Sequence, residues 1–266
     1  MKKIILCDGD SWTAGDIVDP EIFGDNLAEV NHVDNRPYRL PKVWPNKLGK
    51  LLNIEVDNFS VAGSSNDGIV RRTIAKTLEA LKKYDTSELF VIVGWSSPER
   101  KDFYFKGEWN SWETLYPAQL TQSQPNKDLE KFYKIYLKYF WNEEEYMSRY
   151  IQHNLYLHYF LKSKNIDHLF FSAFYETKNN SEGSGMFKDI ELYDSIITDN
   201  INFSDSYTIE EFSKIHDNVF KKISFRRLLM EDNKFRDGLF GDDFHPTERA
   251  HQLWAEELYK DLKDKI

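Results

Sequence analysis

A serine, a histidine and an aspartate stand where they could form a hydrolytic triad. Ser11 follows the apolar run at 4–7, and Asp242 lies three residues before His245 near the C-terminus. A hydroxyl becomes a good nucleophile when a base removes its proton, and an imidazole is that base when a carboxylate orients it. Taken alone, each residue also has a structural explanation, such as helix capping by Ser11. Taken together they predict a serine nucleophile, with Asp243 as a second candidate for the orienting carboxylate.

The elements around these residues alternate between strands and helices. Short apolar runs predict buried strands, and spacings of three and four residues predict amphipathic helices. The strands are expected at 2–7, 54–56, 89–93 and 168–171, and the helices near Ser11, at 42–52, 70–81 and 129–164, and after a cap at Thr247. Such alternation indicates a parallel sheet covered by helices. A parallel sheet would bring the serine and the histidine together at one edge.

Three segments interrupt the alternation, so we expect one domain, 1–266, with insertions at about 16–41, 98–127 and 176–240. The second insertion is rich in aromatic residues, namely Phe103, Tyr104, Phe105, Trp109, Trp112 and Tyr116. Aromatic faces at the mouth of a site suit sugar rings or acyl chains, whereas the same rings can fill the insertion's own small core. The second interpretation is favoured for most of them.

Composition argues against several classes of protein. The formal net charge of -9 disfavours nucleic acid or an anionic membrane as a partner. The single cysteine, Cys7, excludes an intrachain disulfide and predicts an inert buried thiol. No stretch approaches the roughly 18 apolar residues of a membrane span. The apolar run after Lys2-Lys3 is too short for a signal peptide, so we expect a cytoplasmic protein, or one released without such a peptide. The sequence indicates no oligomeric state.

Four blocks, taken in order, resemble those of the SGNH (GDSL-like) hydrolases. They are Gly9-Asp10-Ser11, Asn58-Phe59-Ser60-Val61-Ala62-Gly63, Gly94 after the third strand, and Asp242 to His245 before the last helix. The resemblance spans most of the chain, although each block is short. It implies a flavodoxin-like three-layer α/β/α sandwich with a mostly parallel central sheet. It also implies that Ser11 is the nucleophile, His245 the base and then the acid, and Asp242 the orienting carboxylate, with no metal and no cofactor.

The resemblance also implies an oxyanion hole, which this chain would build differently. Backbone N–H groups of Ser11 and Gly63 fit as donors, because a glycine allows close approach. The family usually has Gly-x-Asn-Asp after the third strand, whereas Ser96 stands here at the asparagine position. A serine hydroxyl is shorter and donates only when its rotor points correctly. Three alternatives remain: Ser96 substitutes, Asn66 donates instead, or the site is catalytically weak.

Substrate contacts are expected from Trp12, Trp95 and Arg100, which lie beside these blocks in the sequence. Arg100 could recognise an anion, or it could pair with Glu99 or Asp102. The expected substrate is a small-molecule or glycan ester, with carbohydrate O-acetyl groups as the leading choice because many relatives process them. The alternatives are a carbohydrate-binding or structural protein that has lost its activity, and a lipid or thioester acyl-hydrolase.

Overall fold

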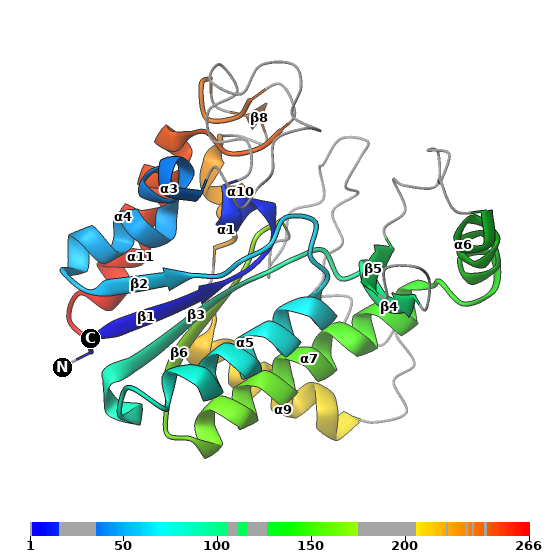
Figure 1. Ribbon diagram of the computed structural model, residues 1–266, viewed down its shortest axis with the longest axis horizontal. Helices are drawn as coiled ribbons and strands as arrows, with labels where there is room; N and C mark the ends of the chain where they lie inside the picture. The colour runs from blue at the N-terminus through cyan, green and yellow to red at the C-terminus, as the bar shows by residue number, and fades with distance from the viewer. Residues whose placement is uncertain are drawn as a thin grey trace.

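The computed structural model describes residues 2–15, 36–105, 111–115, 127–174, 206–221, 223–231, 234–235, 237–241 and 244–266. Its centre is a four-stranded sheet in the order β2-β1-β3-β6, in which every neighbouring pair is parallel (Figure 1). The strands are β1 (Ile4–Asp8), β2 (Glu55–Asn58), β3 (Leu89–Trp95) and β6 (Asp167–Ser172). All four expected strands are therefore present, and the predicted parallel sheet is confirmed.

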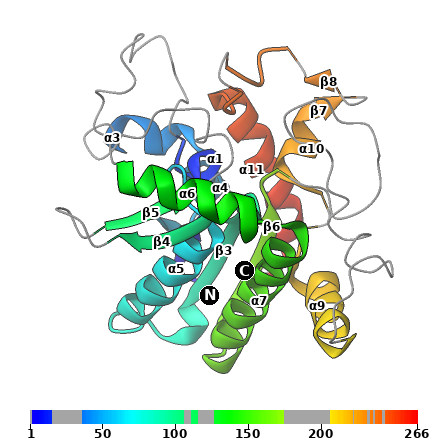
Figure 2. The ribbon, with the colours of Figure 1, turned by 90° about the vertical axis from the view of Figure 1, so that its right-hand side faces the viewer.

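Helices cover both faces of this sheet (Figures 1 and 2). One face carries α4 (Trp44–Leu52) and α11 (Glu248–Leu262), and the other carries α5 (Asn66–Ala80) and α7 (Glu143–Ser163), with α9 (Ser206–Val219) beside α7. This is the predicted three-layer α/β/α arrangement. The shorter helical elements are α1 (Ser11–Ala14), α3 (Arg36–Arg39), η2 (Leu40–Lys42), η3 (Thr86–Glu88) and α10 (Phe225–Leu229).

The central strands lie where continuous apolar runs predicted them. Every residue of β1 and β3 is buried, as expected of strands covered on both faces. β3 runs two residues past the predicted end, through Gly94 to Trp95. Cys7 is fully buried in β1, and burial raises the pKa of its thiol well above the usual value. The expectation of a buried cysteine is confirmed.

Two helix expectations were wrong in detail. The helix predicted over 129–164 is two helices, α6 (Lys127–Tyr139) and α7, which are separated at 140–142. Asn142 starts the second one, because its side chain accepts a hydrogen bond from Glu145 N at 2.8 Å. Thr247 does occupy the position before α11, but its hydroxyl donates to Gly238 O at 2.9 Å instead of capping that helix.

The second predicted insertion contains a hairpin with its own small core. Strands β4 (Lys101–Phe105) and β5 (Ser111–Leu115) pair antiparallel, and Figure 1 shows them with α6 beyond the carboxyl ends of the sheet. Phe103 packs with ring centroids 4.7 Å from Phe132 and 5.1 Å from Tyr136. The core-filling interpretation is therefore confirmed for Phe103. Trp109, Tyr116 and the side chains of Phe105 and Trp112 lie outside the described residues.

The other two predicted insertions are described only in part. Residues 16–35 and 175–205 lie outside the described ranges. The remainder of 176–240 contains α9, α10 and a second hairpin of β7 (Met230–Glu231) and β8 (Lys234–Phe235).

Candidate functional site

Ser11 lies at the carboxyl end of β1, where it begins the short helix α1. The side chain of Asp10 caps this helix, because its Oδ1 accepts from Trp12 N at 3.0 Å. Gly15 ends the helix in the left-handed conformation, with φ 74°. The Ser11 residue is 8% exposed, so it lies just beneath the surface. The strand-to-helix turn predicted at this serine is confirmed.

Two glycines let α1 pack tightly against β3. A Cβ at Gly9 would lie 2.3 Å from Thr13 Oγ1 and 3.0 Å from the carbonyl oxygen of Gly94. A Cβ at Gly94 would lie 2.8 Å from the Phe171 ring and 3.0 Å from Thr13 Oγ1. Larger residues would push these elements apart. The glycines of the first and third blocks therefore set the position of α1.

The second block lies alongside the turn that leads from β1 to α1. Asn58 Nδ2 donates to Thr13 O in α1 at 3.0 Å, and Val61 N donates to Gly9 O at 3.3 Å. Gly63 follows with φ +70°, a conformation that favours glycine, and no atom of the described residues lies within 4 Å of the Cβ it lacks. Its backbone conformation thus explains the glycine.

The third block is fixed by internal hydrogen bonds. Ser96 is 1% exposed, and its hydroxyl donates to Asp10 Oδ2 at 2.9 Å. The Asn66 amide pairs with the backbone of Ser96, accepting from its N at 2.9 Å and donating to its O at 3.0 Å. Both candidates for the third oxyanion donor therefore bond within the protein. The sequence pattern did not indicate Asp10 as the acceptor for Ser96.

Arg100 lies against Asp10. The sequence analysis expected a bound anion, Glu99 or Asp102 in its place. Its Nη1 lies 3.4 Å from Asp10 Oδ2, 3.0 Å from Ser96 Oγ and 3.3 Å from Ser64 O. The guanidinium also lies over the Phe174 ring, 5.6 Å from its centroid. No pattern in the sequence indicated this contact.

Asp8 is a second buried carboxylate near the nucleophile that the sequence analysis missed. It accepts from Arg72 Nη2 at 2.8 Å, Thr73 Oγ1 at 3.0 Å and Gly9 N at 2.7 Å. Burial raises the pKa of Asp8 to about 6, although the charge and hydrogen bond of Arg72 act in the opposite direction. An acidic residue ending an otherwise apolar strand was the signal that could have found it.

His245 lies on a segment that packs against α1. Its carbonyl accepts from Gly241 N at 2.9 Å, and the next residue, Pro246, forms a bridge with Phe240. The Phe240 ring lies 5.7 Å from the ring of Trp12, which follows the predicted nucleophile. Asp242 and Asp243 lie outside the described residues. The complete triad therefore stays a prediction.

Phe244, beside the predicted base, combines two unfavourable features. Its φ is 62°, which is strained for a residue with a bulky side chain, and it is 56% exposed. A hydrogen bond from its N to Gly241 O at 3.0 Å holds the turn. Strained backbone of this kind concentrates at functional sites and costs about 1–3 kcal/mol. No sequence signal pointed to this residue.

The two tryptophans expected to contact substrate are mainly core residues. Trp95 is fully buried, with its ring 5.3 Å from Phe170 and 6.1 Å from Tyr150. Its place in a strand covered by helices on both faces leaves no surface for a substrate, so that expectation was wrong. Trp12 is 6% exposed and packs on Phe174 at 4.8 Å. It positions α1 and offers little of its ring to a ligand.

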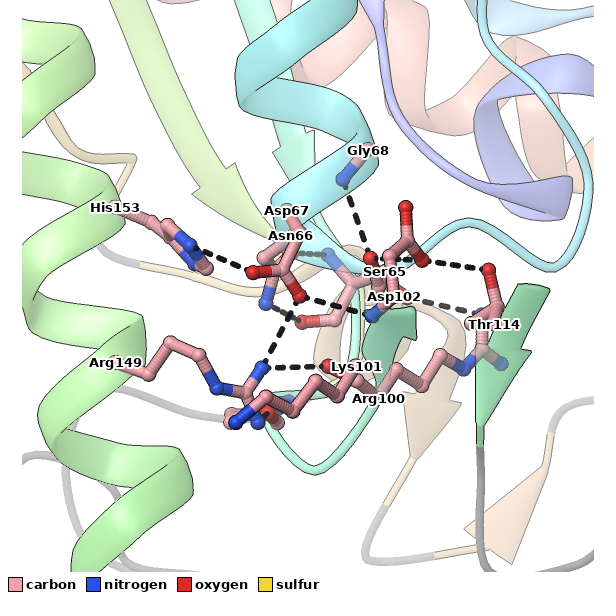
Figure 3. Close-up of polar contacts among 12 residues, drawn as sticks. Ser65, Asn66, Asp67, Gly68, Arg100, Lys101, Asp102, Thr114, Arg149 and His153 are labelled. Carbon is pink, nitrogen blue, oxygen red and sulfur yellow. Dashed lines mark hydrogen bonds and ion pairs between the residues drawn. The ribbon is translucent and has the colours of Figure 1, made fainter. Parts of the chain in front are cut away.

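A network of partly buried carboxylates joins the β4–β5 hairpin to the helices (Figure 3). Asp102 of β4 accepts from Ser65 Oγ at 2.6 Å and Arg71 Nη2 at 2.6 Å, both near the start of α5. It also accepts from Thr114 Oγ1 of β5 at 2.7 Å. One carboxylate thus ties both strands of the hairpin to the helix that follows the second block.

Asp67, in the first turn of α5, is the other acceptor in this network. Figure 3 shows Arg149 and His153 reaching it from α7, with Arg149 Nη1 at 3.3 Å and His153 Nε2 at 3.2 Å. The backbone N of Asp102 donates to it at 3.2 Å. Burial alone would raise the pKa of Asp67, but the hydrogen bond and charge of His153, the charge of Arg149 and this N–H lower it to about 2.

The described part of the chain contains neither a cluster of metal ligands nor a membrane-spanning helix. Within these ranges, no three His, Cys, Asp or Glu side chains lie together as metal ligands would. Among the described helices, none has the length and apolar character needed to cross a membrane.

The overall fold is similar to that of several solved structures. A protein from Desulfitobacterium hafniense DCB-2, assigned to the lipolytic G-D-S-L family, is 15% identical, aligns over 98% of this chain and 100% of its own, and gives a TM-score of 0.53. TesA is 12% identical over 99% of this chain and 100% of its own, with a TM-score of 0.51. The chain therefore has the SGNH-like hydrolase fold.

Comparison at the level of sequence gives one family. No curated protein matches the chain. One family, described as "Family of unknown function (DUF6071)", matches residues 25–265. With nearly the whole sequence covered by that match, the chain belongs to the DUF6071 family, and it has the fold of the SGNH-like hydrolases.

Proposed function

We propose that this protein is a serine esterase that needs no metal and hydrolyses small acyl esters, with O-acetyl groups on carbohydrate as the leading substrate class. The observation that carries the proposal is the position of Ser11. It begins α1 at the carboxyl end of β1, and the loop bearing Gly63 is hydrogen-bonded to Gly9 beside it. Ligands of open α/β sheets bind at this edge. The SGNH-like fold supports the same reaction class.

The proposed reaction proceeds through an acyl-enzyme. Ser11 Oγ attacks the ester carbonyl carbon while its proton passes to His245 Nε2, and Asp242 orients the ring through Nδ1. Backbone N–H groups of Ser11 and Gly63 stabilise the oxyanion. The bond to the alcohol then breaks as His245 returns the proton to the leaving oxygen. Water, deprotonated by His245, attacks the acyl group, and Ser11 leaves with that proton to release the carboxylic acid.

A second candidate is a glycan-binding protein on the same fold with little or no turnover. The observation that favours it is the third block, where the Ser96 hydroxyl donates to Asp10 and the Asn66 amide pairs with the Ser96 backbone. Loss of one oxyanion donor typically lowers turnover by about 10²- to 10³-fold. A site with only backbone donors would then be slow.

Turnover of p-nitrophenyl acetate by purified wild type and Ser11→Ala tests the proposal. We expect the variant to lose turnover and to lose labelling by a fluorophosphonate, which forms an adduct with an activated serine. Ser163→Ala, at the exposed end of α7, is the matched control and should behave as wild type. Full activity of Ser11→Ala, or strong inhibition by a chelator, would contradict the proposal.

The choice of substrate separates the remaining alternatives. Acetylated xylooligosaccharides and p-nitrophenyl esters from acetate to octanoate should show preference for the acetyl group. A preference for long chains would indicate a lipid acyl-hydrolase. Binding of glycan by wild type without turnover or labelling would favour the binding protein.

A further inference from the structure

One nitrogen of Arg100 contacts the first block, the residue that follows the second block, and the third block. Nη1 lies 3.4 Å from Asp10 of the first block, 3.3 Å from the carbonyl of Ser64 just after the second, and 3.0 Å from Ser96 Oγ of the third. The guanidinium side chain is 17% exposed, and Asp10 is fully buried. Hydrogen bonds to charged groups are stronger than neutral ones, so this contact fixes the three segments relative to one another.

The residues that Arg100 holds are next to the predicted oxyanion donors. Asp10 directly precedes Ser11, and Ser64 directly follows Gly63. Ser64 is itself tied into a turn, because its N and its Oγ donate to Val61 O at 3.3 Å and 2.7 Å. The spacing of the two backbone donors therefore depends on a bridge that passes through one guanidinium nitrogen.

Arg100 also balances a negative charge beside the reaction centre. The Asp10 carboxylate accepts from Trp12 N, from the neutral hydroxyl of Ser96 and from Arg100. Arg100 alone among these three carries a positive charge. A buried carboxylate without its cation would oppose the negative charge that develops on the substrate oxygen. A neutral donor in the third block would not correct this.

We propose that Arg100 is a positioning residue that compensates for the missing asparagine of the third block. It sets the spacing of the Ser11 and Gly63 N–H groups and neutralises Asp10, so that two backbone donors suffice. This inference rests on the proposed ester hydrolysis. It assigns Ser96 a structural role, which is to hold Asp10 together with Arg100.

The test compares Arg100→Gln and Arg100→Lys with wild type on p-nitrophenyl acetate. Arg100→Gln should lower kcat by about 10²-fold and leave KM nearly unchanged, because the loss acts on the transition state. Arg100→Lys keeps the charge and should retain kcat within about tenfold, since an ammonium can donate to several acceptors. A rise in KM at constant kcat would instead make Arg100 a substrate-binding residue and overturn the proposal, as would wild-type activity of Arg100→Gln.

A double-mutant cycle with Asp10→Asn separates this role from general structural support. Asparagine still caps α1 but carries no charge. In that background, Arg100→Gln should cost much less than about 10²-fold in kcat, because no carboxylate remains to be neutralised. Additive losses would overturn the proposal. Arg71→Gln, which removes the ion pair with Asp102 instead, is the matched control and should show no coupling to Asp10→Asn.

Failure of the esterase proposal can be told apart from failure of this one. If wild type neither turns over esters nor reacts with a fluorophosphonate, the double-mutant cycle is measured with melting temperatures in place of kcat. Coupling of Arg100→Gln with Asp10→Asn, absent for Arg71→Gln, would then support the bridge, and additivity would overturn it. If Arg100→Gln does not fold, Arg100→Lys decides, and a kcat loss as large as that of Ser11→Ala would contradict the proposal.

Discussion

Asp10 receives the hydroxyl hydrogen of Ser96, the residue at the asparagine position of the third block. Its carboxylate accepts from Ser96 Oγ at 2.9 Å while it also caps α1. A hydroxyl has one hydrogen to donate. Donation to Asp10 therefore competes with donation to a substrate oxygen, and we expect Ser96 to act on the proposed reaction through Asp10.

Ser96→Ala should lower kcat of ester hydrolysis by less than about tenfold, well below the roughly 10²- to 10³-fold cost of losing a direct oxyanion donor. Arg100 still holds Asp10 in this variant. Steady-state kinetics of purified protein measures the effect, with the melting temperature as a check on folding. A kcat loss above about 10²-fold with KM unchanged would show that the hydroxyl turns toward the substrate.

For single residues, local structure that depends on adjacent positions could be predicted, whereas contacts between distant positions could not. The strand-to-helix turn at Ser11 follows from adjacent residues and is confirmed. The bridge through Arg100 joins positions 10, 64 and 96, which only the folded chain brings together. Trp95 was misassigned because its position beside a block says nothing about which side of the sheet its ring occupies. The triad stays a prediction, since Asp242 lies outside the described residues.

Helices α4 and α11 are joined by a buried imidazole. His251 Nδ1 accepts from Trp44 N, the first residue of α4, at 3.3 Å. Burial, together with the charges of Lys47 and His245, lowers the pKa of His251 to about 3. Helix periodicity predicted both helices from sequence. It could not predict this contact, because His251 was not part of the apolar stripe that identified α11.

The acid sensitivity of the fold should depend on His251. Its folded pKa of about 3 lies below the unfolded value of about 6.5, so its contribution is complete above pH 6.5 and is lost as the pH falls toward 3. His251→Asn keeps an acceptor for Trp44 N but does not titrate. Urea unfolding should therefore show a smaller loss of stability in this variant between pH 6.5 and 4. Equal losses in both proteins would contradict the assignment.

Asp67 should affect the free energy of unfolding at lower pH than His251 does. Its folded pKa of about 2 lies below the unfolded value of about 3.9, so its contribution is present above about pH 4 and is lost as the pH falls to 2. The stability advantage of wild type over Asp67→Asn should shrink over this window by up to about 2.6 kcal/mol, which follows from the two pKa values. Urea titrations at pH 7, 4 and 3 measure it. An advantage that stays constant would mean that Arg149 and His153 do not favour the charged form.

The molecule as a whole is held by aromatic contacts between layers. Trp254 of α11 is fully buried, 4.9 Å from Phe171 of β6 and stacked 5.0 Å from Phe225 of α10. The apolar strand at 168–171 and the stripe of the last helix predicted that Phe171 and Trp254 form the core, whereas Phe225 lies in the segment predicted as an insertion. Their pairing depends on the order of the strands, which sequence periodicity does not reveal.

Trp254→Ala should lower the free energy of unfolding by about 3–5 kcal/mol, because it leaves a cavity between three elements. Trp254→Phe should cost less than about 1.5 kcal/mol. The phenyl ring keeps the stack, and the indole N–H has no hydrogen-bond partner among the described residues. Chemical denaturation measures both. A phenylalanine variant as unstable as the alanine variant would show that an unseen partner holds the indole nitrogen.

The β4–β5 hairpin and α6 have a small apolar cluster of their own. Their cluster of Leu115, Leu129, Tyr133 and Tyr136 is separate from the sheet-centred core, and Trp141 packs against both. Cooperative units of this kind open independently, each with its own free energy. Amide hydrogens of α6 should then exchange with solvent faster than those of β1 and β3. The hairpin side of the site would open and close by partial unfolding, while the strand that leads to Ser11 stays intact.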